Sequence, residues 1–352
     1  MIEVRNLVKK YGDHLAVDHL DFKIETGRIY GFLGPNGAGK STTMNIMTGY
    51  LGATEGEVII DGHDILKEPE EAKRHIGYLP EQPPLYMDMT VREYLEFAAE
   101  LKGIGKKQRV GEIEEAERLV KIKDVEKRLI KNLSKGYRQR VGLAQAVLGF
   151  PEIIILDEPS VGLDPKQIIE IRELIRRLAE NHTVILSSHI LAEVREVCDY
   201  IMIISKGKLV ASDTPENLER MLGQQNVVEI EAKTPSSEIR RVLKNVPGIE
   251  MIETQTAGGG ITRGSIREKK GEDIRENVFR AFAGADIPLL TMKVSGTSLE
   301  DVFMELTQRD TVPAAFTKNA GWKEILPEKD KDSEDQEDWT AGEGAEKDGG
   351  DL

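Results

Sequence analysis

Cysteine is nearly absent from this sequence. The 352 residues include a single one, Cys198, so no disulfide can form within the chain. Disulfides stabilise many proteins of oxidising compartments, whereas reducing compartments keep thiols free. The composition therefore favours a protein of a reducing compartment, and we expect it in the cytoplasm.

Long apolar runs are missing as well. The longest, such as the YIMII segment that begins at Tyr200, fall far short of the roughly 18 residues that a membrane-spanning helix needs. The first residues, MIEVRNLVKKYGD, lack the apolar block of a signal peptide. We expect contact with a membrane to be peripheral or to be made through a partner.

Net positive charge is missing too. Lys and Arg number 48 against 62 Asp and Glu, which gives a formal net charge of −14. That sign disfavours a nucleic-acid partner, although a local basic patch such as residues 138–140 escapes an argument from net charge. Residues 323–352 hold twelve Asp or Glu against four Lys. This composition predicts a disordered acidic tail that keeps the protein soluble, and partner binding is the alternative.

The first 223 residues predict an α/β domain. Apolar runs of strand character alternate with turns and amphipathic helices; they read RIYGFL, EVIIDG, HIGYLP, EIIILDEP, HTVILSSH and YIMIISKG. This order is typical of a largely parallel sheet. Between about residues 90 and 146 the pattern is almost wholly helical, and we interpret that block as a helical insertion.

Residues 226–309 predict a second, smaller domain. Strand VVEIEA, helix SSEIRRVLKNV, strands IEMIETQT and ITRGSIRE, helix DIRENVFRAF and strand LLTMKV follow one another, which is the order of the ferredoxin-like split βαββαβ motif. In the final segment, TSLEDVFMEL, four apolar residues share one helical face: Leu299, Val302, Phe303 and Leu306. We expect this face to pack on a neighbouring domain.

A candidate phosphate-binding loop follows the strand RIYGFL. Residues 34–41 read GPNGAGKS, the pattern G-x-x-x-x-G-K-S, between a strand and a helix. Glycines let backbone N–H groups surround phosphate oxygens, Lys40 reaches the β- and γ-phosphates, and Ser41 offers an oxygen to Mg²⁺. A chance glycine turn is the alternative interpretation. The predicted nucleotide-binding residues are Gly34, Pro35, Asn36, Gly37, Ala38, Gly39, Lys40, Ser41 and Thr42.

Two consecutive carboxylates end the apolar strand IIILDEP. The C-terminal edge of a buried strand is where open α/β sheets bind ligands. Asp157 suits direct or indirect Mg²⁺ binding, whereas Glu158, which points elsewhere, suits a base that polarises water for attack on a γ-phosphate. Without the phosphate loop, an acidic exit from a strand would be the favoured interpretation.

The segments GPNGAGKS, LSKGY followed by RQR, IIILDEP, SVGLDP and SSH occur in this order. Together they resemble the ATP-binding-cassette ATPases over about the first 220 residues. The resemblance implies a phosphate-loop NTPase fold with a helical insertion, and ATP and Mg²⁺ as ligands. It also implies that Tyr11 stacks on adenine and that Gln82 touches Mg²⁺ and the attacking water. A strand-end aromatic and a polar loop residue are the alternatives for these two positions.

Three further roles rest on the same resemblance. His189, in SSH, stands where the family has a histidine that contacts the γ-phosphate, although a lone histidine is more often structural or solvated. We expect the helix after it to carry Leu191, Val194, Val197 and Ile201 on its inward face. Asp164, in SVGLDP, resembles a loop residue that crosses to the other subunit and shapes the water site, and an Asp-Pro turn is the alternative.

The signature loop of the family, usually LSGGQ, reads LSKGY here. Ser134 and Gly136, which the resemblance places on the γ-phosphate held by a partner subunit, are both present. The helix after them would direct its N-terminus at that anion. We interpret Lys135 as solvated, with added positive charge near ATP as the alternative, and its presence implies that this position does not require positive φ.

The resemblance implies a head-to-tail homodimer that holds two ATP molecules, with Lys40, Glu158 and His189 as the catalytic residues. The ending SLEDVFMELT further resembles the ATPase subunits of type-2 exporters, including the multidrug, sodium and gliding-motility-associated branches. These drive a separate integral-membrane permease, which would hold the protein at the inner face of the cell membrane. The alternative is a soluble cassette ATPase that acts on ribosomes or DNA. A phosphate-loop GTPase or kinase is disfavoured, because no Asn-Lys-x-Asp base reader is present.

Overall fold

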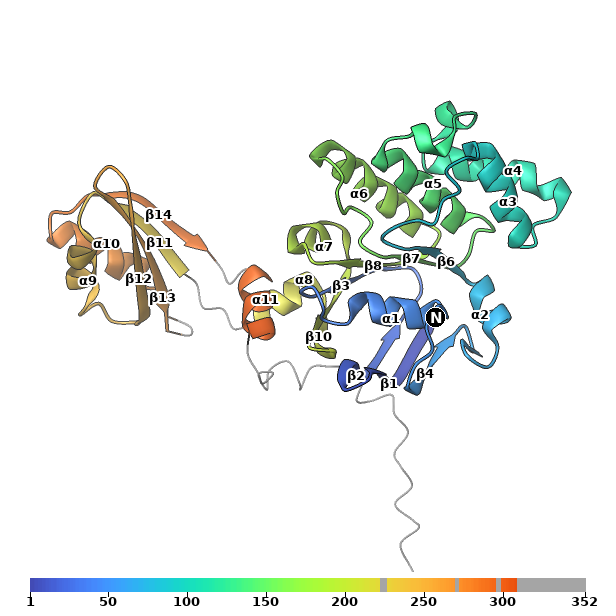
Figure 1. Ribbon diagram of the computed structural model, residues 1–352. Helices are drawn as coiled ribbons and strands as arrows, with labels where there is room; N and C mark the ends of the chain where they lie inside the picture. Colours follow the sequence, from blue (N-terminus) through green and yellow to red (C-terminus); the bar gives the residue numbers. More distant parts are fainter. Residues whose placement is uncertain (222–226, 270–271, 296–298, 309–352) are drawn as a thin grey trace, which may run out of the picture. The chain divides into compact units, whose positions relative to one another are not determined.

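The computed structural model describes residues 1–221, 227–269, 272–295 and 299–308 (Figure 1). The predicted boundaries at residues 223, 226 and 309 and the predicted acidic tail lie outside these ranges. The described residues form three sheets, two of them before residue 222 and the third after residue 226.

The first sheet is antiparallel. Its strand order is β2-β1-β4-β5, with β1 (Ile2–Tyr11), β2 (His14–Ile24), β4 (Glu55–Ile60) and β5 (His63–Asp64). The assignment of EVIIDG, which overlaps β4, to the parallel sheet is therefore wrong. β1 gave no clear strand signal because bulges after Val4 and Leu7 break its register with β2, and Asn6 has a positive φ of 47°.

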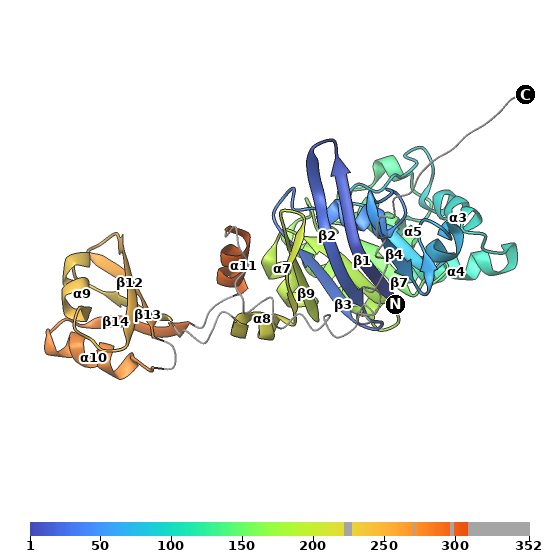
Figure 2. The same ribbon diagram turned by 90° about the horizontal axis from the view of Figure 1, so that it is seen from below.

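The second sheet is the predicted parallel one. Its order is β10-β9-β3-β8-β7-β6, and all pairs except the antiparallel β9/β10 are parallel. The strands are β3 (Ile29–Leu33), β6 (Ile76–Leu79), β7 (Ile153–Leu156), β8 (Thr183–Ser188), β9 (Tyr200–Ser205) and β10 (Lys208–Asp213). In Figure 2 the strands of the antiparallel sheet lie in front of it.

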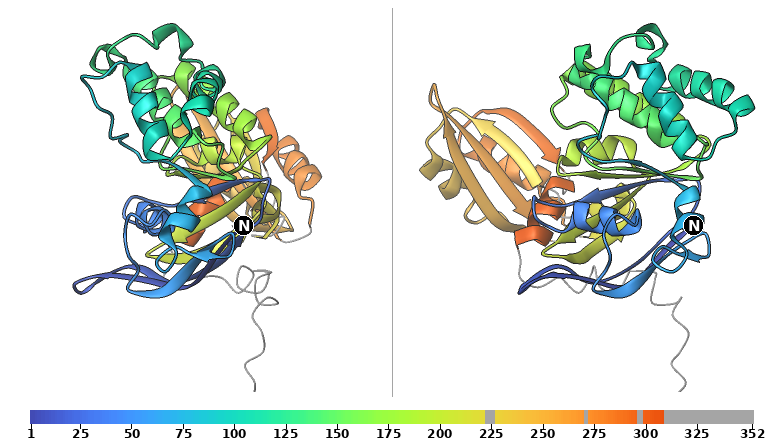
Figure 3. Two further views of the ribbon diagram at one scale, coloured as in Figure 1. Left: turned by 90° about the vertical axis from the view of Figure 1, so that its right-hand side faces the viewer. Right: turned by 45° about the vertical axis from the view of Figure 1, so that its right-hand side comes forward.

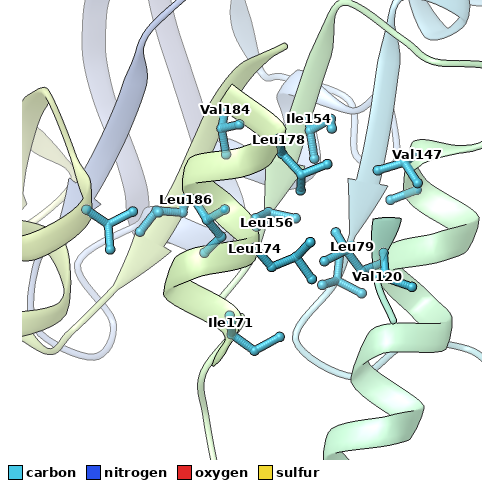
Figure 4. Packing of buried hydrophobic residues seen from close by; sticks show 14 of the residues in the cluster. Leu79, Val120, Val147, Ile154, Leu156, Ile171, Leu174, Leu178, Val184 and Leu186 are labelled. Carbon is cyan, nitrogen blue, oxygen red and sulfur yellow. The ribbon is translucent and has the colours of Figure 1, made fainter. Parts of the chain in front are cut away.

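Two hydrophobic cores cover the two faces of the parallel sheet. Ile154 and Leu156 of β7 face the core formed with α5 (Lys135–Val147), α6 (Pro165–Ala179) and α7 (Leu191–Val197), and Figure 4 shows their packing against Leu174 and Leu178. Ile153 and Ile155 face the opposite core, formed with α1 (Lys40–Met47) and the antiparallel sheet. A strand buried on both faces reads as a continuous apolar run.

The predicted helical block contains α3 (Val91–Leu101), α4 (Lys106–Leu119) and α5, joined by the 3-10 turns η1 (Lys123–Val125) and η2 (Ile130–Asn132). These helices stand together on one side of the parallel sheet (Figure 3). Thr90 starts α3 with a capping box, because its hydroxyl accepts the Glu93 N–H while the Glu93 carboxylate accepts the Thr90 N–H. The short helix α2 (Pro69–Arg74) precedes β6.

Helix α7 ends earlier than the sequence suggests. Its last residue is Val197, and Cys198 already has an extended backbone, with φ −90° and ψ 137°. Ile201 therefore lies in β9 and not on the helix. The carboxylate of Asp199 accepts the backbone N–H of Ile29, at 2.8 Å, which fixes the chain as it leaves the helix.

After residue 226 the elements follow the order that the sequence predicts: β11 (Val227–Ala232), α9 (Ser236–Leu243), β12 (Ile249–Ala257), β13 (Ile261–Glu268), α10 (Arg275–Gly284) and β14 (Leu289–Ser295). The sheet is antiparallel, in the order β12-β13-β11-β14, and has a core of its own. The helix α11 (Leu299–Gln308) contacts α8 (Pro215–Met221) and β9. Its residues Leu299, Val302 and Leu306 are buried in the core of the first 221 residues.

Candidate active site

The glycine-rich loop joins β3 to α1. Gly37 and Gly39 have positive φ values of 78° and 105°, which glycine adopts at little cost. A Cβ atom on Gly39 would lie 2.5 Å from the carbonyl oxygen of Ala16, and one on Gly34 would lie 2.3 Å from that of Ile204, whereas Gly37 faces open space. The loop is thus packed against other backbone at Gly34 and Gly39 and is open at Gly37, as a loop that surrounds phosphate requires.

Lys40 is the first residue of α1 and is 5% exposed. Its Nζ donates to the carbonyl oxygens of Gly34 at 2.8 Å and Pro35 at 3.3 Å. It also lies 3.6 Å from Oε1 of Glu158. A buried ammonium group is thereby held at the loop by oxygen atoms that point toward it, which stabilises its charge.

Ser187, at the penultimate position of β8, organises the two consecutive carboxylates. Its Oγ donates to Oδ1 of Asp157 and accepts the backbone N–H of Glu158 at 2.9 Å. Glu158 has a φ of 48°, an uncommon value for a residue with a side chain. This turn separates the directions of the two acids: Asp157 Oδ1 accepts a hydrogen bond from Ser41 Oγ at 3.2 Å, whereas Glu158 reaches Lys40.

His189 lies beside Glu158. Nδ1 of the imidazole is 2.9 Å from Oε2 of the carboxylate, within hydrogen-bond distance. In this pair an ionised carboxylate would accept and Nδ1 would donate. Glu158 is 7% exposed, whereas the His189 side chain is 41% exposed. The carboxylate is therefore held inside while the ring reaches the surface of the site.

A cleft of about 450 Å³ joins these groups. Of the predicted residues it is lined by Tyr11, residues 36–42, Glu158 and His189. Tyr11 is 49% exposed and its ring lies under Lys9 Nζ, 5.3 Å from the centroid. The sequence analysis missed four other residues of the lining: His14, Ala16, Glu81 and Val161. His14 and Ala16 lie at the start of β2, Glu81 follows β6, and Val161 lies in the SVGLDP segment. Their residue types alone do not indicate a binding role.

Gln82 lies outside this cleft. It lines an adjoining depression of about 840 Å³ that shares Ser41 with the cleft and also reaches Asp157. Tyr78, on the same depression, donates its hydroxyl to Asn45 Oδ1 at 3.0 Å, and burial raises the pKa of this phenol. Gln82 is therefore near the Ser41–Asp157 pair but belongs to a separate surface.

Ser134, Gly136 and Asp164 form a second group, which does not line the cleft. Ser134 is the N-cap of α5 and its Oγ accepts the Tyr137 N–H at 3.4 Å, while Asp164 is the N-cap of α6 and accepts the Gln167 N–H at 2.9 Å. A Cβ on Gly136 would lie 2.8 Å from the Gln167 side chain. The starts of α5 and α6 are thus packed together.

Lys135 is exposed, as the sequence analysis expects, and its φ is not positive. Its ammonium group lies beside Gly162: a Cβ on that glycine would be 2.1 Å from Lys135 Nζ. Among the described residues it makes no ion pair with a carboxylate. The side chain therefore spans from the start of α5 to the loop before α6.

Comparison with known proteins identifies the family. A model described as ABC transporter matches residues 17–161. The chain is 35% identical over 314 residues to the bacitracin transport ATP-binding protein BcrA of Bacillus licheniformis, and the match covers 89% of this chain and 99% of that protein. The chain belongs to the ABC transporter ATP-binding proteins. The chain is also 31% identical over 313 residues to the linearmycin resistance ATP-binding protein LnrL of Bacillus subtilis. That match covers 88% of this chain and 99% of LnrL.

A solved structure agrees with this assignment. The dimeric structure of a post-hydrolysis state of the ATP-binding cassette MJ0796, bound to ADP and Pi, is 27% identical, with a TM-score of 0.56, and covers 61% of this chain and 98% of that one. The present ABC protein is accordingly the ATP-binding subunit of a transporter and an ATPase. Within its described residues, no helix is both long and apolar enough to cross a membrane.

Proposed function

We propose that this ABC protein is the motor subunit of an exporter, in which a homodimer drives a separate integral-membrane permease. One observation carries the catalytic part: Glu158 is held between Lys40 Nζ, at 3.6 Å, and His189 Nδ1, at 2.9 Å, on a cleft with a glycine cradle. A carboxylate in that position can accept a proton from water while the lysine faces phosphate.

Each catalytic side chain has a distinct task in this proposal. Lys40 stabilises negative charge on the β- and γ-phosphates of ATP, and Glu158 orients and deprotonates the attacking water. His189 holds Glu158 through Nδ1, and Nε2 would donate to the γ-phosphate when the imidazole carries a proton on both nitrogens. Tyr11, exposed at the rim of the cleft, stacks on the adenine ring.

Mg²⁺ fits the same site. Ser41 Oγ and Asp157 Oδ1 lie 3.2 Å apart, and both are hard oxygen ligands. Among the described residues no group of three or more His, Cys, Asp or Glu could hold a metal alone, so these two residues would bind it together with phosphate oxygens, and Gln82 would approach from the adjoining depression. When bound, Mg²⁺ neutralises charge on the β- and γ-phosphates.

A second copy completes the site. Ser134, Gly136 and Asp164 do not line the cleft of their own chain, yet the α5 N-terminus that Ser134 and Gly136 form suits an anion. In a head-to-tail pair, this group of one chain closes over the ATP held by the other. ATP binding would then close the dimer, and hydrolysis would reopen it.

Support for a role in transport comes from the relatives of this chain. Bacitracin transport and linearmycin resistance are the activities in the names of two full-length relatives, which supports export of a compound of that kind.

We further propose that residues 1–223 form the ATP-binding domain and that residues 226–309 form an accessory domain. The helical insertion at about residues 90–146 would be the part that contacts the permease. The separate core of β11 to β14 supports that division. The protein would then work at the cytoplasmic face of the membrane, with residues 323–352 as an acidic tail.

The catalytic proposal is tested with Glu158→Gln. We expect the variant to bind ATP with unchanged affinity and to lose hydrolysis by about a hundredfold or more, the range of a general base. Glu152→Gln is the matched control, since Glu152 precedes the same strand and is 65% exposed; it should hydrolyse ATP normally. Full hydrolysis by Glu158→Gln would refute the role of this carboxylate.

The transport proposal is tested by co-purification from native membranes. A tagged Glu158→Gln chain should bring down an integral-membrane protein with several spans in the presence of ATP. Recovery of ribosomes or DNA instead, with no membrane protein, would favour the alternative of a soluble cassette ATPase.

A further inference from the structure

Glu193 is a buried carboxylate to which the catalytic proposal assigns no role. It lies in the first turn of α7 and is 7% exposed. Its Oε2 accepts hydrogen bonds from Ser160 Oγ and, at 3.2 Å, from Ser188 Oγ. Both serines are buried, 8% and 1% exposed. Within the described part of the chain Glu193 has no Lys, Arg or His partner.

The two serines belong to the two loops that carry the candidate catalytic groups. Ser160 lies two residues after Glu158, in the connection to α6 that continues to Asp164. Ser188 directly precedes His189, and its Oγ also accepts the N–H of Ile190 at 3.0 Å. One serine thus fixes the backbone on both sides of His189, and Glu193 fixes that serine.

Stability alone does not account for this arrangement. Burial of a carboxylate without a cation is costly, and a neutral or apolar residue of similar size is often as good or better for the folded state. A single carboxylate oxygen, Oε2, accepts from both hydroxyl groups and so orients both. The free-energy cost of burying the Glu193 carboxylate is explained if function requires the connection between the two loops.

The loops have a second connection, which the candidate catalytic side chains themselves form. It is the Glu158–His189 hydrogen bond of 2.9 Å. If His189 turns toward a phosphate, or Glu158 toward water, this bond lengthens or is lost. The bonds of Glu193 involve neither side chain, so neither movement requires them to break.

We propose that Glu193 is a positioning residue. It keeps the segment from Glu158 to Asp164 and the His189 loop in a fixed relative position while His189 turns toward phosphate and Glu158 toward water. This inference rests on the proposed function, since it assigns His189 and Glu158 their roles. When a second copy contacts Asp164, the displacement of that segment would be transmitted to His189 through Ser160, Glu193 and Ser188.

The experiment compares Glu193→Gln and Glu193→Ala in the full chain, with the apparent KM for ATP and kcat measured separately. An amide oxygen can take the place of Oε2, but it lacks the charge that strengthens both hydrogen bonds. We expect kcat to fall about tenfold in Glu193→Gln, the effect of one charged hydrogen bond, and further in Glu193→Ala. The KM should change less than about twofold, because the phosphate loop is untouched, and the melting temperature should not fall in Glu193→Gln.

A double-mutant cycle with His189→Ala separates positioning from a general structural effect. If Glu193 acts through His189, Glu193→Gln should reduce single-turnover phosphate release by less than about twofold in the His189→Ala background. Ser188→Ala, which removes one of the two bonds without a buried charge, should reproduce part of the kcat loss. Glu117→Gln is the matched control: Glu117 is fully buried in α4 beside Lys123, at 3.0 Å, and its change should leave kcat per folded molecule unchanged.

Two results would overturn the proposal: an unchanged kcat in Glu193→Gln and Ser188→Ala, or the same tenfold loss with and without His189. Neither result would affect the proposed function, which fails separately if Glu158→Gln hydrolyses ATP normally. If Glu193→Ala does not fold, the Ser188→Ala and Glu193→Gln variants decide alone.

Discussion

Oε2 of Glu158 lies 2.9 Å from Nδ1 of His189, and this contact joins two loops separated by thirty residues of sequence. The other oxygen of Glu158 lies 3.6 Å from Lys40 Nζ. Three candidate catalytic groups from three different elements therefore form one chain of contacts, and removal of one should affect the others.

His189→Ala should lower kcat by about a hundredfold, within the range of acid–base and positioning groups, because Glu158 loses the partner that orients it. ATP affinity should be retained, since Lys40 and the glycine loop are unchanged. Phosphate release and nucleotide binding measure the two quantities. His75→Gln, at the opposite end of the parallel sheet before β6, should leave kcat unchanged. Equal losses in both variants would point to a general effect of histidine removal.

Ser134→Arg should abolish ATP-driven dimerisation, because a large cation would fill the anion site at the start of α5. Binding of ATP to the monomer should persist. Size-exclusion chromatography with ATP, in a Glu158→Gln background that cannot hydrolyse, measures the dimer. Lys135→Gly, one residue away, should change ATPase activity by less than about threefold, as for most exposed charges. A large loss in this second variant would assign the Lys135 ammonium beside Gly162 to the ATP site.

Ser187→Ala should lower both turnover and stability. The change leaves the buried N–H of Glu158 without its acceptor, which costs about 1–3 kcal/mol of unfolding free energy. The turn that separates Asp157 from Glu158 should loosen, so kcat should fall. Thr262→Val in β13 is the control. The buried hydroxyl of Thr262 donates to the carbonyl of Thr234, and both residues are far from Ser187 in the sequence. It should lose comparable stability in urea denaturation and no ATPase activity per folded molecule.

Lys102 should give the stability a distinct dependence on pH. Its ammonium donates to the carbonyl oxygens of Ala146 and Leu148 near the end of α5, at 3.1 and 2.6 Å. Although the residue as a whole is exposed, burial of this group lowers the pKa of Lys102 from 10.5 to about 8. Between these values the unfolded chain binds the proton that the folded chain has lost, so this group raises stability as pH increases.

Lys102→Met should remove that rise. The unfolding free energy of the wild type minus that of the variant should increase between pH 8 and pH 10 in urea titrations, and should be level below pH 7.5, where the lysine is protonated in both states. Lys107→Met, an exposed lysine of α4, provides the comparison and should show no such slope. A constant difference across the range would contradict the lowered pKa.

Cys198 should be unreactive in the folded protein. It is 6% exposed, and burial raises the pKa of its thiol, so the reactive thiolate is scarce. We expect negligible labelling by a disulfide reagent at pH 8 and complete labelling in urea. Because no other cysteine is present, the labelling rate would report opening of α7 directly. Fast labelling without denaturant would mean that this helix opens locally.

The sequence predicts the parts of the site that depend on local motifs. The phosphate loop, Asp157 with Glu158, and His189 each stand at the end of an apolar strand, and parallel strands bring such ends to one edge of the sheet. The continuous apolar runs of β7 and β8 follow from burial on both faces. These features are confirmed in the fold.

The remaining features depend on contacts between distant segments. Ser187 and Glu193 have no distinctive local pattern, and they matter because β8 and α7 lie against the loop after β7. β1 was missed because bulges interrupt its alternation. Ile201 was placed on the helix since the apolar spacing continues past Val197, where the chain turns into β9.

The alternation of β7 has a last consequence for the protein's tolerance of change. Ile153 and Ile155 belong to one core and Ile154 and Leu156 to the other, so the strand cannot slide by one residue without exchanging every side chain between the cores. The same slide would move one of Asp157 and Glu158 into the position of the other and displace the second acid from the pair. Insertions or deletions within residues 153–158 should therefore be more damaging than any single substitution there, because two apolar layers together fix which acid faces Ser41 and which faces Lys40 and His189.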